Sequence, residues 1–118
     1  MLQPLAQLGV VGVRYRGSQF AERDLRSLDA YTAANAYSAA GIPFTVTEPR
    51  LDAARRVADE PTNLGQLGGE IATAVAAASR AGQAVLLTGG DCSHITGVIG
   101  GLQDAHGVDA RIGLVWFD

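Results

Sequence analysis

The sequence contains no lysine, because all nine of its basic residues are arginine. Chemistry that needs a lysine amine, such as Schiff-base catalysis, is therefore excluded for this chain. Cysteine occurs once among the 118 residues, at Cys92, so no disulfide can form within the chain. A chain without disulfides fits a reducing compartment, and we expect a cytoplasmic location.

Long hydrophobic runs and clusters of basic residues are also missing. No apolar stretch approaches the roughly 18 residues that a membrane span needs. Residues 1–13 lack the basic flank and the cleavage site of a signal peptide. The net charge of −3 has no basic block within it, so we expect neither a membrane nor a nucleic acid as a partner. The 47% of hydrophobic residues is sufficient for one domain with a buried core.

Hydrophobic periodicity predicts strands that alternate with helices. The expected strands are 9–15, 43–48, 84–88 and 111–117; the expected helices are 24–40, 63–81 and 93–105; residues 49–61 form a connection. Helical connections of this length force neighbouring strands to pair in parallel. The sequence therefore predicts an α/β fold, a three-layer α-β-α sandwich with a parallel sheet.

Two helix details can be predicted from single residues. Asn63 and Gln66 have the spacing of a capping box at the start of the second helix, and Ser93 is expected to cap the third. Glycines in the third helix each weaken it by roughly 1 kcal/mol relative to alanine. We expect Gly97, Gly100 and Gly101 to be tolerated because this helix lies very close to the sheet.

Side chains that can carry chemistry gather after the third expected strand, in the segment Gly-Gly-Asp-Cys-Ser-His at 89–94. Ligands of open parallel sheets bind beyond the carboxyl ends of the strands, where residues 14–17, Glu48 and Asp118 also lie. The segment is neither a dinucleotide fingerprint, nor a Walker loop, nor a Gly-x-Ser-x-Gly elbow. A nucleophilic pair of Cys92 with His94 is a minor alternative, since residues two apart at such a turn usually diverge.

Two segments resemble motifs of the arginase/agmatinase (ureohydrolase) family. Residues 89–93, "GGDCS", follow a strand, precede a helix, and resemble the first metal motif of that family, usually Gly-Gly-Asp-His-Ser. Residues 114–118, "LVWFD", are similar to the strand that leads into the second motif, Asp-Ala-His-x-Asp. The separation of the motifs and the order of elements from Leu8 onward fit as well. The resemblance implies that residues 1–118 are the N-terminal portion of one arginase-like domain, ending within the second motif.

The resemblance implies a manganese-dependent hydrolase that acts on a C–N bond of a guanidino, amidino or formimino compound. Members of the family bind two manganese ions, and they are commonly trimers or hexamers, which implies a homo-oligomer. By position, Asp118 matches a metal ligand, and Cys92 stands where the family has its first ligand histidine. Asp91 and Ser93 match supporting residues. His94 can replace the missing histidine only if the turn is rearranged.

The cysteine leaves alternatives open. A thiolate prefers softer ions than manganese, so two ions, one ion or none are all compatible with this motif. A small residue buried at a strand end is the structural alternative for Cys92, and a partly solvated position in the first helical turn is the alternative for His94. We expect the remaining ligands beyond residue 118, in the same chain or a companion chain, and these 118 residues alone to be inactive. The competing functions are a non-catalytic or single-metal family member that serves as a binding or structural subunit, and an unrelated flavodoxin-like binding module.

Overall fold

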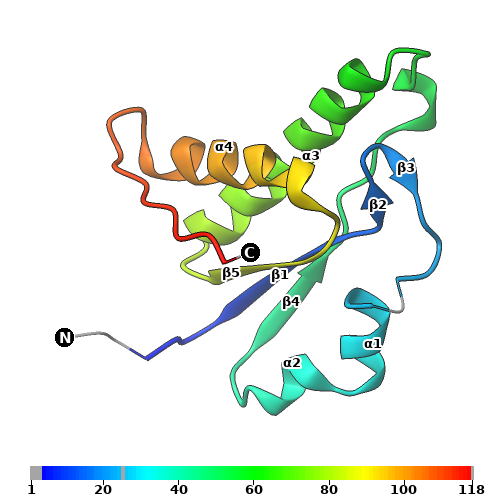
Figure 1. Ribbon diagram of the computed structural model, residues 1–118. Helices are drawn as coiled ribbons and strands as arrows, with labels where there is room; N and C mark the ends of the chain where they lie inside the picture. Colours follow the sequence, from blue (N-terminus) through cyan, green and yellow to red (C-terminus); the bar gives the residue numbers. More distant parts are fainter. Residues whose placement is uncertain (1–3, 25, 118) are drawn as a thin grey trace.

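The computed structural model describes residues 4–24 and 26–117 and has a parallel sheet at its centre (Figure 1). The sheet consists of β1 (Leu8–Val13), β4 (Phe44–Thr47) and β5 (Ala84–Gly89), in the order β4-β1-β5. Both neighbours pair with β1 in parallel. The strand between them, β1, is buried along most of its length, as its β-branched residues predict. The α/β class and the parallel pairing of these three strands confirm the sequence prediction.

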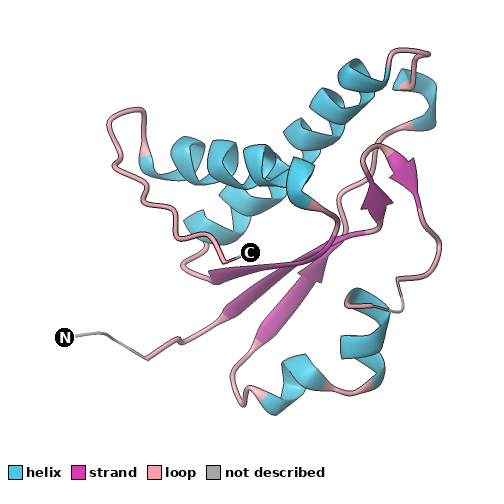
Figure 2. Ribbon diagram, in the orientation of Figure 1, coloured by secondary structure: helices cyan, strands magenta, loops and turns pink. Residues whose placement is uncertain are grey.

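Helices lie on both faces of the sheet, which is compatible with an α-β-α sandwich (Figure 2). One face is covered by α1 (Leu28–Ala33) and α2 (Ala36–Ala39), and the other by α3 (Glu60–Arg80) and α4 (Ile95–His106). Alternate residues of β1 point to opposite faces. Val11 and Val13 pack in the main core with Leu67 and Ile71 of α3, whereas Gly12 lies against Leu28 of α1.

The helix expected over 24–40 is broken in two, so that prediction was wrong. The break is at Asn35, whose φ of 54° lies in the left-handed region. Asparagine tolerates this conformation because its short polar side chain can form local hydrogen bonds. The start of α1 is held by Asp24, which accepts hydrogen bonds from the N–H groups of Ser27 and Leu28.

A small hairpin after β1 was not predicted. Its strands are β2 (Tyr15–Arg16) and β3 (Gln19–Phe20), which pair antiparallel around a turn at Gly17. Gly17 has a φ of 54°, a value that glycine adopts at low cost. The buried hydroxyl of Tyr15 accepts the N–H of Leu51, at 2.9 Å. The hairpin is thereby anchored to the connection that precedes α3, which also contains a 3-10 turn, Ala53–Arg55.

The helix predicted over residues 63–81 is α3, and it begins earlier than predicted, at Glu60. The side chain of Asp59 caps α3 by accepting the N–H of Thr62, and Pro61 occupies the first turn. Proline fits there because its missing N–H needs no partner at that position. The predicted capping box at Asn63 was wrong, because Asn63 is buried and bonds both backbone groups of Val57.

The glycines of α4 allow close contact with α3 rather than with the sheet, so the expected reason for them was wrong. A Cβ on Gly97 would lie 2.8 Å from the carbonyl oxygen of Gly68, and one on Gly101 would lie 2.6 Å from that of Ala72. Both distances are too short for a real contact. Only glycine at these two positions permits the observed approach of the two helices.

The fourth expected strand, 111–117, is not formed. These residues run as a loop from the end of α4 back towards β5 (Figure 1). A strand needs a neighbour for its backbone hydrogen bonds, and this segment does not join the edge of β5. Its large side chains are consequently exposed, including Phe117 at 92%. None of the helices in the described ranges has the length and apolar character to cross a membrane.

Candidate functional site

The turn formed by residues 89–94, called here the 89–94 turn, lies at the carboxyl end of β5. It begins with Gly89 and Gly90, whose φ angles of 81° and 71° both lie in the left-handed region. A Cβ on Gly89 would lie 2.3 Å from the carbonyl oxygen of Val13, and one on Gly90 would lie 2.6 Å from Nδ1 of His94. The glycine pair is therefore required by both backbone conformation and space.

His94 locks this turn to the hairpin. Its side chain is 1% exposed, its Nδ1 accepts the N–H of Asp91 at 2.9 Å, and its Nε2 donates to the carbonyl of Gly17 at 2.8 Å. These partners place the single proton on Nε2, because a carbonyl can only accept and a backbone N–H can only donate. The partly solvated position considered for His94 was wrong. Metal binding through either ring nitrogen would break one of these two bonds.

Asp91 holds the same turn from its other side. One carboxylate oxygen accepts the N–H of Gly17 at 2.7 Å, and the other accepts the N–H of Ser93 at 2.9 Å and its hydroxyl. Burial opposes the charged form, but these hydrogen bonds outweigh it and lower the pKa of Asp91 to about 2. The predicted cap was misplaced by two residues: Asp91, not Ser93, caps the 3-10 turn Cys92–His94 that leads into α4.

The low pKa of Asp91 predicts how stability depends on pH. Because its pKa is lower in the folded protein than the ordinary 3.8, its contribution is complete above about pH 4 and is lost as the pH falls towards 2. We expect Asp91→Asn to be less stable than the wild type at neutral pH and to show a shallower loss of stability between pH 5 and 2. Urea unfolding at a series of pH values measures how the free energy of unfolding of each protein changes with pH. Parallel slopes for the two proteins would contradict the assignment.

Cys92 has an exposed thiol, so the buried packing position considered for it was wrong. It lines a hollow of about 390 Å³ between the end of β5, the start of α4 and the 111–117 segment. The other lining residues are Leu87, Asp91, Ile95, Val98 and Trp116. The thiol is therefore accessible from an apolar recess.

The described residues do not by themselves fit manganese. Within 4–24 and 26–117, no three His, Cys, Asp or Glu side chains converge in a way that could hold a metal ion. His94 and Asp91 are occupied by the hydrogen bonds of the turn, which leaves Cys92 as the accessible ligand of this motif. A thiolate is a softer ligand than manganese prefers. Asp118, the other predicted ligand, lies outside the described residues.

An ion-pair cluster at the same edge was not predicted. Arg14, just beyond β1, bonds both carboxylate oxygens of Asp29 at 2.7 and 2.8 Å, and it also bonds Glu48 just beyond β4. The hydrogen bond to Asp29 contributes most to raising the pKa of Arg14, and the bond to Glu48 contributes next. The pKa of Asp29 in turn falls to about 2, mainly because of its bond to Arg14. The sequence placed Arg14 and Glu48 at this edge, but it gave no indication that they bond.

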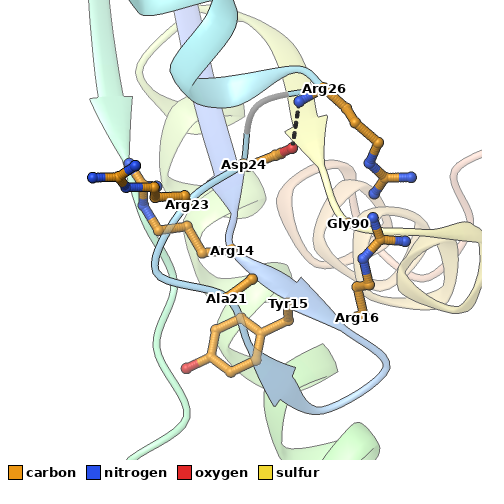
Figure 3. Close-up of a pocket in the computed structure, with 8 residues that line it drawn as sticks. All are labelled: Arg14, Tyr15, Arg16, Ala21, Arg23, Asp24, Arg26 and Gly90. Atoms are coloured by element: carbon orange, nitrogen blue, oxygen red, sulfur yellow. Dashed lines mark hydrogen bonds between the residues drawn. The ribbon is translucent and has the colours of Figure 1, made fainter.

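A hollow of about 240 Å³ lies beside the 89–94 turn (Figure 3). It is open between the β2–β3 hairpin and the segment that leads into α1. Four arginines contribute to its wall, and the lining residues are Arg14, Tyr15, Arg16, Ala21, Arg23, Asp24, Arg26 and Gly90. The sequence predicted residues 14–17 at this edge, but it did not predict that Arg23 and Arg26 lie beside them.

Comparison of the chain with protein-family models gives no match, and comparison with curated proteins gives no match either. The likeness to ureohydrolases therefore rests on residues 89–93 and 114–118 and on the order of the elements.

Proposed function

We propose that this chain is part of a metal-dependent hydrolase of the ureohydrolase type, which cleaves a C–N bond of a guanidino, amidino or formimino compound. The observation that supports this best is the position of residues 89–93. They include the last residue of β5, Gly89, and the four residues after it, at the carboxyl edge of a parallel sheet, where the ligand sites of such sheets lie. The arginase-like version of the α-β-α sandwich and a cytoplasmic location are parts of the same proposal.

In this proposal Asp118 and Cys92 contribute ligands from this chain, and further ligands come from residues outside this sequence. Manganese, when bound, lowers the pKa of a water molecule and so supplies a hydroxide nucleophile. Asp91, Ser93 and His94 position the turn that carries Cys92, through the hydrogen bonds to Gly17 and within the turn. The partners would be a small guanidino-type substrate, the remainder of the enzyme and further copies of the same chain.

One observation favours a second candidate function. His94 uses both ring nitrogens inside the fold, and the accessible side chain at the histidine position of the motif is a thiol. A family member with these features would hold one metal ion or none. It would then bind its ligand, or stabilise an assembly, without hydrolysing anything.

An activity assay on the complete gene product separates the two functions. The purified protein is stripped with a chelator, reloaded with Mn²⁺ and incubated with a panel of guanidino, amidino and formimino compounds. We expect one class of compound to release urea, ammonia or an amide, with the release lost in chelator and restored by Mn²⁺. Binding of a compound without product release would favour the non-catalytic subunit and would contradict the hydrolase.

A further inference from the structure

The hollow beside the 89–94 turn carries positive charge that the fold does not neutralise. Arg14 is compensated, because Asp29 and Glu48 both bond its guanidinium. Within the described ranges, Arg16 and Arg26 form no ion pair. The surplus is local, since the whole chain has a net charge of −3. A concave positive site on an acidic protein is a site that attracts anions.

The carboxylate in the wall of the hollow, that of Asp24, is already engaged in hydrogen bonds within the protein. Asp24 accepts the backbone N–H groups of Arg26, Ser27 and Leu28 and the hydroxyl of Ser27. Burial opposes its charged form, but these hydrogen bonds together lower the pKa of Asp24. Its carboxylate therefore serves to start α1, and it does not bond the guanidinium of either Arg16 or Arg26.

Arg16 and Arg26 approach the hollow from different elements. Arg16 comes from β2 and Arg26 from the segment before α1, and their guanidinium groups point towards one another beside Gly90 (Figure 3). Two like charges at close range repel each other, and an anion between them would remove the repulsion. Each guanidinium also presents a planar fork of N–H donors that matches a carboxylate or a phosphate.

We propose that this hollow binds the anionic group, carboxylate or phosphate, of a small molecule, held between Arg16 and Arg26. The volume of about 240 Å³ is sufficient for such a group. A second hollow of about 380 Å³ shares Arg26 and Gly90 with the first and continues over the face of β5, past Tyr31, Leu86 and Thr88. The remainder of the molecule would lie there, against apolar and hydroxyl-bearing side chains.

This binding requires neither a metal ion nor hydrolysis, so it can be tested separately from the proposed function. The complete protein, without added metal, is titrated with inorganic phosphate, with succinate and with the neutral analogue succinamide. Binding is followed by calorimetry and by the backbone amide signals of Gly89 and Gly90. We expect saturable binding of at least one anion and none of succinamide. The tighter of the two anions identifies the anionic group.

A charge-matched pair of double variants tests the residues. Arg16→Gln with Arg26→Gln should weaken anion binding by at least about tenfold, because two charge-assisted contacts are lost. The control combines Arg55→Gln with Arg80→Gln, two arginines that pair with Glu70 and Asp104 and do not line the hollow. Circular dichroism verifies that both variants are folded. An equal loss in the control, or no saturable binding of either anion by the wild type, would overturn the proposal.

Discussion

Alanine in place of Gly101 is expected to reduce the free energy of unfolding by about 3 kcal/mol, the upper end of the cost of overpacking a core. The added Cβ would lie 2.6 Å from the carbonyl oxygen of Ala72 and 2.7 Å from Cβ of Val75. Both atoms belong to α3, and the site is buried, so α3 and α4 would have to move apart. Urea unfolding followed by circular dichroism measures the loss.

The neighbouring glycine provides the control. A Cβ on Gly100 would have Ala72 Cβ at 3.8 Å as its nearest contact, which is ordinary van der Waals packing. Gly100→Ala should therefore gain up to about 1 kcal/mol from the better helix propensity of alanine. The same substitution one residue apart should thus have opposite signs. Equal effects at the two positions would contradict the close packing of α4 on α3.

Removing the imidazole of His94 is expected to cost about 3 kcal/mol of folding free energy. His94→Ala leaves the N–H of Asp91 and the carbonyl of Gly17 without their partners, and it creates a cavity at a side chain that is 1% exposed. Of the two hydrogen bonds that join the 89–94 turn to Gly17 among the described residues, only the one to Asp91 would then remain. Thermal and urea unfolding of the variant measure the loss.

The second histidine of the chain is the matched control. His106 lies at the end of α4 in an exposed hydrogen bond with the hydroxyl of Ser79. His106→Ala should change the free energy of unfolding by less than about 0.5 kcal/mol, as is usual for surface substitutions. If His94→Ala were equally mild, the turn would not be locked by the imidazole.

Regular elements with strong periodicity could be predicted from the sequence. The strand β5 follows from its run of apolar residues, although only Thr88 of it is buried and Leu86 is exposed. The apolar spacing of Leu67, Ile71 and Val75 predicts α3. Parallel pairing followed from the length of the helical connections alone. These features depend on local pattern, and local pattern is what a single sequence contains.

Three of the failures share a physical cause, which is that the deciding contact lies far away in the chain. The β2–β3 hairpin has strands of two residues, too short to show a periodicity. The glycines of α4 reveal that something approaches closely, but the sequence does not say whether a strand or α3 does. The 111–117 segment has the composition of a strand, yet composition supplies no neighbour for its hydrogen bonds.

In the candidate site, too, local features could be predicted and contacts between distant residues could not. The sequence identified residues 89–94 as the place where polar side chains gather, and the structure has this turn at the expected edge of the sheet. The partners of these side chains could not be predicted, because His94 bonds Gly17 across 77 positions and Arg14 bonds Glu48 across 34. Arg16 and Arg26 likewise meet at one hollow only because the hairpin, which was not predicted, turns the chain back.

The most direct test of the central claim is a calorimetric titration of the complete gene product with Mn²⁺. We expect saturable binding by the wild type and a loss of affinity of at least about tenfold in Asp118→Ala, with a much smaller loss in Cys92→Ser. Cys92→His should bind more tightly than the wild type, because an imidazole suits manganese better than a thiolate. Tight Mn²⁺ binding that survives the loss of Asp118 would contradict the account.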